Sequence, residues 1–191
     1  MKSLRHKKYV HVSPNLSAST WMSLSLDYRW KMFATAFRMT RKRIPFELHA
    51  FLLLETHCHI LFSYLPEEEI TPFQVLDEIH RALILLIEPA PGVDLLKKPF
   101  IIHEIDTRAE LLNAYHYIYR NPLSAELTSD VMEYRYSSLR QLLGVENLNL
   151  PVSDPLFLIS HPKRALIWLN GVDPQLHPRA DLKHGSKTTT H

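Results

Sequence analysis

The pattern of apolar and polar residues predicts a mixed succession of strands and helices. Residues 8–13 alternate in polarity and include β-branched side chains, which predicts a first strand. Two apolar runs at 46–54 and 57–64 predict the paired strands of a hairpin with its bend near Glu55-Thr56, and a single bent strand is the alternative. A shorter run at 99–105 predicts one further strand.

Helical spacing of apolar residues fills the intervals between these strands. A helix is expected from about 23 to 41, where apolar residues recur every three or four positions. A second helix follows Thr71 with a proline in its first turn, and a third follows Thr107, a residue type that caps helices well. A short helix is expected from 161 to 169.

This order of elements predicts an α+β fold. Strand, helix, strand, strand, helix, strand is the ferredoxin-like order, in which an antiparallel sheet carries helices on one face. The helix after Thr107 is then an additional helix. With 191 residues, we expect a catalytic domain at 1–144 and a C-terminal extension at 145–191 that is partly helical and ends in a disordered tail.

Composition places the chain among cytoplasmic proteins with a hydrophobic core. Hydrophobic residues make up 46% of the chain, which suits a globular domain. A single cysteine excludes an internal disulfide and fits a reducing compartment. No apolar run reaches the length of a membrane span, and the basic N-terminus is not followed by the apolar segment of a secretory signal. We therefore expect no membrane association.

Positive charge is concentrated at the N-terminal end of the chain. Residues 1–43 carry ten Lys/Arg against one acid, a net +9, while residues 44–112 carry −8 and residues 113–191 carry +1. The expected helix within the basic segment bears Arg29, Lys31, Arg38 and Arg41 on its polar face. Tyr9, Trp21, Tyr28 and Trp30 are interleaved with these charges. Such a segment could bind a phosphate backbone and stack bases, and a solvated helix face explains the charge equally well.

Two histidines in the hairpin carry the first candidate chemistry. His57 and His59 are two positions apart on a strand, so both side chains leave the same face, while Cys58 points into the opposite layer. Two neutral imidazoles side by side form half of a metal site. Two half-buried histidines bonded to their neighbours are the alternative interpretation.

A tyrosine-rich segment on the additional helix offers the other half of a site. Tyr117 and Asn121 lie one helical turn apart, although Pro122 disfavours helical geometry at Asn121. A tyrosine hydroxyl can attack a phosphoryl group once a cation stabilises the phosphate, and an amide oxygen can complete the metal shell. Tyr115 and Tyr119 are expected to be packing residues, which is also the alternative interpretation of Tyr117.

Three segments, in order, resemble motifs of the REP-associated tyrosine transposases, a subgroup of the single-tyrosine HUH transposases in the IS200-like superfamily. Residues 56–62, Thr-His-Cys-His-Ile-Leu-Phe, resemble the HUH motif. Residues 117–127 resemble the tyrosine signature Y-I-x-x-N-P-[VL]-R-A-G-L, and residues 134–138 resemble the Y-x-W-S-S segment. The resemblance covers roughly residues 8–144.

This chain departs from the family pattern at three places. Glu55-Thr56 stands where Pro-Asn usually precedes the first histidine. Ser124-Ala125-Glu126 stands where Arg-Ala-Gly usually follows Asn-Pro, and Tyr136 stands where tryptophan is common. The residues that correspond to the catalytic set are all present.

The resemblance implies a metal-dependent endonuclease and strand transferase that acts on single-stranded DNA near hairpin or palindromic repeats. His57, His59 and Asn121 would hold Mg²⁺ or Mn²⁺, and Tyr117 would form a 5′-phosphotyrosine intermediate. We expect a monomer, and a dimer stays open. Candidate DNA-binding residues are Arg38, Arg41, Lys42, Arg43, Arg120, Lys163 and Arg164.

Two other functions stay open at this stage. The changes at Ser124 and Glu126 are compatible with a domesticated single-stranded DNA-binding protein of the same fold that has lost catalysis. An unrelated metal-dependent hydrolase could instead combine the histidine pair with His103 or His116.

Overall fold

The structure, a computed structural model, describes most of the chain. The described residues are 7–16, 19–66, 69–87, 96, 100–157 and 161–171. The C-terminal tail that we expect to be disordered lies outside them. No helix within these ranges is long and apolar enough to cross a membrane.

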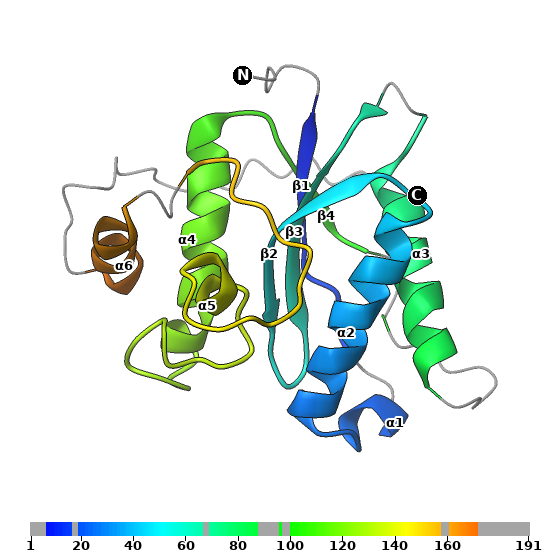
Figure 1. Ribbon diagram of the computed structural model, residues 1–191, viewed down its shortest axis with the longest axis horizontal. Helices are drawn as coiled ribbons and strands as arrows, with labels where there is room; N and C mark the ends of the chain where they lie inside the picture. The colour runs from blue at the N-terminus through cyan, green and yellow to red at the C-terminus, as the bar shows by residue number, and fades with distance from the viewer. Residues whose placement is uncertain are drawn as a thin grey trace.

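Four strands form one antiparallel sheet in the order β2-β3-β1-β4 (Figure 1). The strands are β1 (Lys8–Val12), β2 (Phe46–Leu53), β3 (Cys58–Tyr64) and β4 (Ile102–Ile105). The ferredoxin-like prediction is confirmed, with a fourth strand shorter than the apolar run suggested. β1 lies between β3 and β4, and this position determines which histidines are neighbours on the sheet.

Helices cover both faces of this sheet (Figure 1). The helices are α1 (Ser19–Met22), α2 (Leu26–Arg41), α3 (Pro72–Leu86), α4 (Arg108–Ser124), α5 (Leu139–Leu142) and α6 (Pro162–Asn170). The pair α2 and α3 packs on one face, as the ferredoxin-like order requires, and α4 packs on the other. The additional helix α4 therefore forms a second helical layer, on the opposite face of the sheet from α2 and α3.

Local capping residues explain where the helices begin. Ser25 accepts a hydrogen bond from the Tyr28 amide, so α2 starts at Leu26, three residues later than its apolar spacing suggested. Thr71 and Thr107 each form a capping box at the start of α3 and α4. Pro122 lies inside α4, which continues to Ser124.

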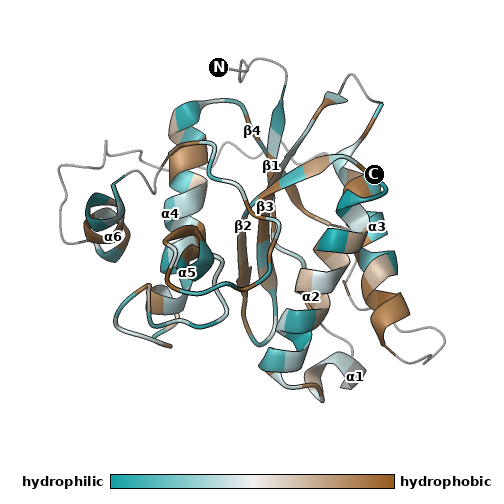
Figure 2. Cartoon of the chain, in the orientation of Figure 1, coloured by the Kyte–Doolittle hydropathy of each residue, from teal (hydrophilic) through white to brown (hydrophobic). Residues whose placement is uncertain are grey.

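The hydrophobic core has two parts, one on each face of the sheet. β2 and β3 are buried along nearly their whole length and form the apolar centre of the molecule (Figure 2). Three of the four aromatic residues that might have stacked on bases are instead core residues, namely Tyr9, Trp21 and Trp30. Only Tyr28 of that set is exposed, so the base-stacking hypothesis is wrong for the other three.

Arg29 also lies in the interior, contrary to its predicted place on a solvated helix face. Its side chain is 1% exposed. One guanidinium nitrogen donates to the Glu55 carboxylate at 2.7 Å and another donates to the Glu55 carbonyl oxygen at 2.7 Å. Helical periodicity places Arg29 on the polar side, but this side of α2 meets the β2–β3 bend, and the carboxylate there makes burial of the charge tolerable.

The C-terminal region joins the same core. Val152 forms a parallel bridge with Leu48 on β2, and Leu150 and Leu156 are buried in the two core clusters. These contacts tie the described residues beyond 144 to the sheet. A domain boundary at 144 stays a prediction.

His49 links this C-terminal segment to the sheet. It sits at a bulge of β2 and is fully buried. Its Nε2 lies 2.8 Å from the Ser63 hydroxyl and its Nδ1 lies 3.0 Å from the Ser153 hydroxyl. Burial lowers the pKa of His49 to about 4, with Glu47, Lys7 and the Ser153 carbonyl as smaller influences.

We therefore expect stability to fall in mild acid. The unfolded chain takes up a proton at His49 below about pH 6.5, whereas the folded protein does so only near pH 4. The free energy of unfolding should drop between these values, by about 1–3 kcal/mol from this residue. Urea denaturation of the protein and of His49→Gln across pH 4–7 isolates the effect, because the amide keeps hydrogen bonds without titrating. Parallel pH profiles would contradict the assignment.

Candidate active site

Four histidines lie in a row across the sheet face that α4 covers. His57 and His59 have ring centroids 5.0 Å apart. Cys58 between them is buried in the opposite core cluster, under α2 and α3, as strand alternation predicted. The two other members of the row are His11 on β1 and His103 on β4, which are cross-strand partners.

His11 is the site residue that sequence reasoning missed. Its Nε2 lies 3.1 Å from Nδ1 of His59, and both side chains are buried. Its only sequence signal is its place on the first strand, two residues from the core residue Tyr9. That spacing predicts which face of the sheet His11 lies on. It does not predict that His11 contacts His59, which depends on the pairing of β1 with β3.

The buried imidazoles are held in their neutral form. Burial lowers the pKa of His59 to about 3, and its neighbours His11 and His57 add to the effect. Burial also lowers the pKa of His11 to about 4, helped by His103. The pKa of His57 is lowered by burial alone. Neutral imidazoles keep a nitrogen lone pair available to a cation.

Tyr117 packs edge-on against this row. Its ring centroid lies 5.4 Å from that of His59 and 5.9 Å from that of His11. The side chain is 53% exposed, so one side of the ring faces the histidines while the residue stays accessible. His59 and Tyr117 are 58 positions apart in the sequence, yet their rings meet within one chain.

The two neighbouring tyrosines face the core, as expected of packing residues. Tyr115 and Tyr119 are buried. The Tyr115 hydroxyl donates to the His49 carbonyl at 3.4 Å, and the Tyr119 hydroxyl lies 3.0 Å from that of Ser138. Two positions along a helix turn a side chain by about 200°, which explains why Tyr117 points elsewhere.

Asn121 follows Tyr117 by one turn of α4 and is half-buried. Because the helix runs through Pro122, the two residues share a face. Within the described ranges, no recorded hydrogen bond joins the Asn121 side chain to His57 or His59. No group of three or more His, Cys, Asp or Glu side chains in these ranges is arranged to hold a metal.

Nε2 of His59 is an atom that could bind a cation. Nε2 of His59 is buried and has no hydrogen-bond partner, although its Nδ1 is paired with His11. A buried nitrogen without a partner is costly unless something binds it. Imidazole nitrogen also suits divalent transition metals such as Mn²⁺. The residues present therefore fit a divalent ion beside His59.

A short segment after α4 fastens this helix to the sheet. Ser138 lies between two elements: its hydroxyl accepts from the Phe51 amide at 2.9 Å and contacts the Tyr119 hydroxyl. The Ser138 amide in turn donates to the Phe51 carbonyl, and the Leu53 amide donates to the Tyr136 carbonyl. The segment that resembles Y-x-W-S-S thus pairs with the edge of β2 and also contacts α4.

α6 holds α4 from the outer side. The His116 ring lies 5.1 Å from that of Trp168, and Arg120 donates to the Leu169 carbonyl at 3.1 Å. DNA binding by Arg120 stays a prediction, and one of its guanidinium nitrogens makes this hydrogen bond to α6. His116 was a candidate third metal ligand, and its contact with Trp168 places it against α6 instead. His103 contacts His11 rather than the His57–His59 pair.

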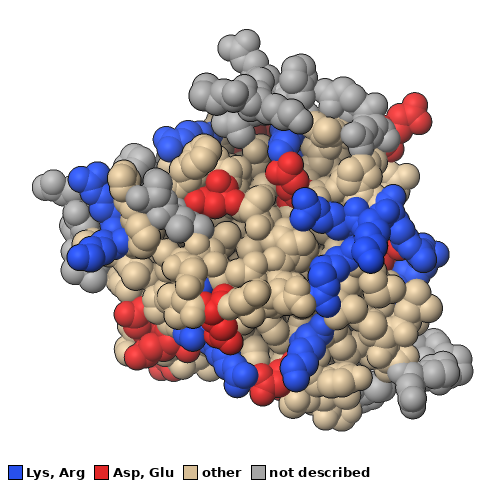
Figure 3. All heavy atoms as spheres, in the orientation of Figure 1, with Lys and Arg blue, Asp and Glu red and all other residues tan. Residues whose placement is uncertain are grey.

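The basic residues of α2 lie far from Tyr117. Arg38, Arg41, Lys42 and Arg43 gather where α2 ends and β2 begins (Figure 3). That end of the hairpin pairs Phe46 with Tyr64, whereas His57 lies at the other end, about 20 Å along the strands. Arg43 also forms an ion pair with Glu78. These cations are not positioned to contact the phosphate that Tyr117 would attack.

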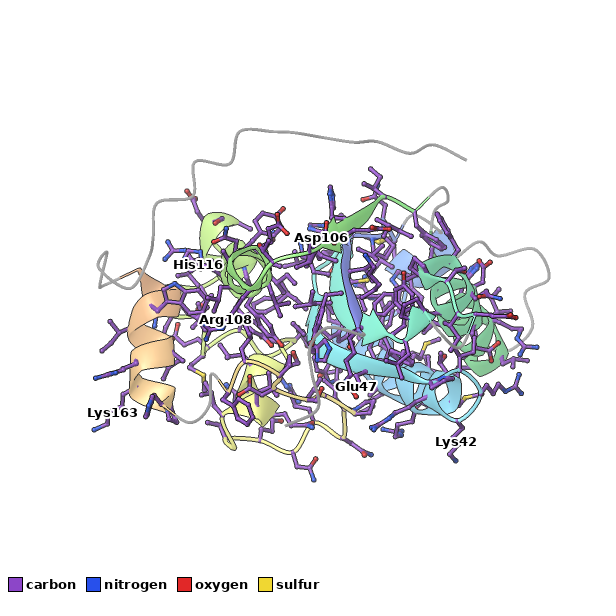
Figure 4. The ribbon with its side chains drawn as sticks, turned by 90° about the horizontal axis from the view of Figure 1, so that it is seen from above. Lys42, Glu47, Asp106, Arg108, His116 and Lys163 are labelled. Carbon is purple, nitrogen blue, oxygen red and sulfur yellow. The ribbon has the colours of Figure 1, made fainter. Side chains whose placement is uncertain are left out.

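Lys163 and Arg164 are exposed on α6. Lys163 lies at the opposite edge of the molecule from Lys42 (Figure 4). A third set of cations was not singled out from the sequence. Lys7, Lys8 and Arg108 line a cavity of about 230 Å³ on the α4 side of the sheet. Arg108 begins α4, about 14 Å before Tyr117 along the helix.

The helix that carries Tyr117 ends in a Schellman motif with an unusual residue. The Leu127 amide donates to the Pro122 carbonyl and the Glu126 amide donates to the Leu123 carbonyl. Glu126 has a φ of +57°, the left-handed conformation in which glycine is favoured. The family signature has glycine at this position, so its replacement affects the backbone as well as local charge.

We expect Glu126→Gly to stabilise the protein by about 0.5–1 kcal/mol, because glycine removes the strain of the left-handed conformation. Ala125→Gly is the matched control. Ala125 has a φ of −90°, so glycine there should only add chain entropy to the unfolded state and destabilise. Urea denaturation of both variants tests the opposite signs, and destabilisation by Glu126→Gly would contradict the prediction.

Comparison with known proteins supports the fold. No protein-family model and no curated protein matches this chain. Among solved structures, that of the REP-associated tyrosine transposase bound to a REP hairpin is similar, with a TM-score of 0.61 and 20% sequence identity. The similarity covers 78% of this chain and 88% of that chain. The protein therefore has the fold of that transposase.

Proposed function

We propose that this protein is a REP-associated tyrosine transposase, a metal-dependent enzyme that nicks and joins single-stranded DNA. The observation that carries the proposal is the contact between Tyr117 and His59 on the shared fold. The motifs that resemble this family are read from the sequence, whereas the contact comes from the structure, and both point to the same residues.

His57 and His59, with Asn121 on the facing helix, would hold Mg²⁺ or Mn²⁺. The bound ion would polarise the scissile phosphate and neutralise charge that builds on its oxygens. Tyr117 is the residue of α4 able to attack, because its ring is exposed while Tyr115 and Tyr119 are buried and their hydroxyls are engaged.

The reaction balances without water. Tyr117 Oη bonds to phosphorus, the bond from phosphorus to the 3′ oxygen breaks, and the phenol proton is transferred so that a free 3′-OH remains. Attack of a 3′-OH on the 5′-phosphotyrosine reverses these steps and joins strands. The phosphodiester bond is conserved as a phosphotyrosine ester, so joining needs no external energy source.

We infer that the substrate is single-stranded DNA beside a hairpin. The similar transposase is bound to a REP hairpin. In this chain, Lys7, Lys8 and Arg108 lie on the face that carries Tyr117, at the end of the sheet where Lys8 pairs with Tyr64, and could contact phosphates of the bound strand away from the scissile bond. Because Tyr117 meets the histidines of its own chain, one protomer contains both halves of the site, which favours a monomer.

We expect Tyr117→Phe to abolish a covalent protein–DNA adduct. The assay is a labelled single-stranded hairpin incubated with Mn²⁺ and resolved on a denaturing gel. Tyr28→Phe is the matched control, because Tyr28 is also about half exposed but lies on α2. An adduct that persists in Tyr117→Phe would assign the nucleophile elsewhere. Hairpin binding without an adduct in the unmodified protein would favour the catalytically inactive form.

Metal removal should stop cleavage but spare much of the DNA binding. Chelation with EDTA and the His57→Ala substitution are each expected to lower the cleavage rate by at least about 100-fold, because charge on the phosphate is no longer neutralised. Binding should change little, since it depends on phosphate contacts elsewhere. Cleavage and gel-shift assays on the same hairpin separate the two effects. Full activity in EDTA would refute the metal requirement.

A further inference from the structure

We propose that His11 is a positioning residue that fixes the tautomer and orientation of His59, so that Nε2 of His59 is the atom presented to the metal. The inference rests on the proposed function and deepens it. His11 lies on β1, outside the three segments that resemble family motifs. Its role follows from where the sheet places it.

The hydrogen bond between the two rings contains one proton. It joins Nε2 of His11 to Nδ1 of His59 over 3.1 Å, with both rings buried. For Nε2 of His59 to coordinate a cation it must lack a proton, so the neutral ring carries its proton on Nδ1. That proton is then donated to Nε2 of His11, which accepts it. With His11 as the acceptor, the bond holds His59 in the tautomer that can bind metal.

The unpartnered atom of His59 agrees with this assignment. Nε2 of His59 is buried and bonded to nothing in the described structure, while Nδ1 is satisfied. A proton on Nε2 of His59 would make His11 the donor of this hydrogen bond and would leave the buried N–H of His59 without an acceptor. The tautomer with the proton on Nδ1 leaves a lone pair facing the site. Metal-bound histidines commonly have such an orienting partner for their second nitrogen.

The sheet holds His11 rigidly in this place. β1 is hydrogen-bonded to β3 on one side and to β4 on the other, so its backbone has little freedom to shift. The ring is covered by its neighbours and is 8% exposed. His11 is therefore poorly placed to contact DNA, and the nitrogen nearest to His59 is committed to that residue. These features suit a supporting residue on a stiff element.

His103 provides a matched control. It lies opposite His11 on the neighbouring strand, with ring centroids 6.0 Å apart, and its side chain is exposed. No recorded contact in the described residues joins His103 to His59. Replacing His103 removes a histidine of the same row without removing the bond that the proposal depends on.

The experiment measures Mn²⁺ binding to the full-length protein without DNA, by calorimetry or by electron paramagnetic resonance. His11→Ala should weaken Mn²⁺ binding by about 10–100-fold, the usual effect of losing an orienting partner. His11→Gln, whose amide oxygen can accept the proton, should recover part of the affinity. His103→Gln should bind as the unmodified protein does. Unchanged affinity in a folded His11→Ala protein would overturn the proposal.

The tautomer itself gives a second measurement that does not depend on any variant. Nitrogen-15 NMR of the metal-free protein should show His59 protonated on Nδ1. Protonation of His59 on Nε2 would overturn the proposal even if His11→Ala weakened Mn²⁺ binding. If the unmodified protein bound no Mn²⁺ while His59 had the expected tautomer, the metal requirement of the proposed function would fail and the hydrogen-bond assignment would stand. If Mn²⁺ bound equally to all variants, only the role of His11 would fail.

Discussion

The need to bury both faces of one small sheet governs the rest of this structure. β2 and β3 are almost wholly buried, so each face of the sheet requires a cover. α2 and α3 cover one face, and α4 covers the other with residues that belong to the second core cluster. Packing of α4 is what brings Tyr117 against His59. The candidate site is therefore assembled by the same contacts that complete the core.

Departures from the family pattern have physical explanations once neighbours are known. Glu55 replaces a proline before the histidine pair, and it is the partner of the buried Arg29. An arginine at this depth without a carboxylate would be strongly destabilising, so the two residues are best understood as a unit. Glu126 has a different explanation, because it occupies a left-handed position where its side chain is a backbone liability. Neither change removes a residue of the candidate site.

Periodicity in the sequence predicted most elements but not what they meet. The hairpin, the start of α3 and α4 and the burial of Tyr115 and Tyr119 followed from local patterns. Arg29 and His11 did not, because a helical or strand period gives the direction of a side chain and leaves its tertiary neighbour undetermined. The basic end of α2 was assigned to DNA from charge alone, yet chain direction places it at the far end of the hairpin.

α4 is held in place by contacts on three sides, and this affects how the proposed enzyme would work. Ser138 ties the helix to β2, α6 packs on its outer side, and the core holds its inner face. Tyr117 is thus already beside the histidines before any DNA is bound, so little conformational entropy need be lost at this residue when substrate arrives. Two imidazoles and one amide would also leave coordination positions of a bound metal open. Under the proposed function, a phosphate oxygen of the DNA would fill one of them, so the substrate itself would complete the metal shell at the moment when Tyr117 is aligned for attack.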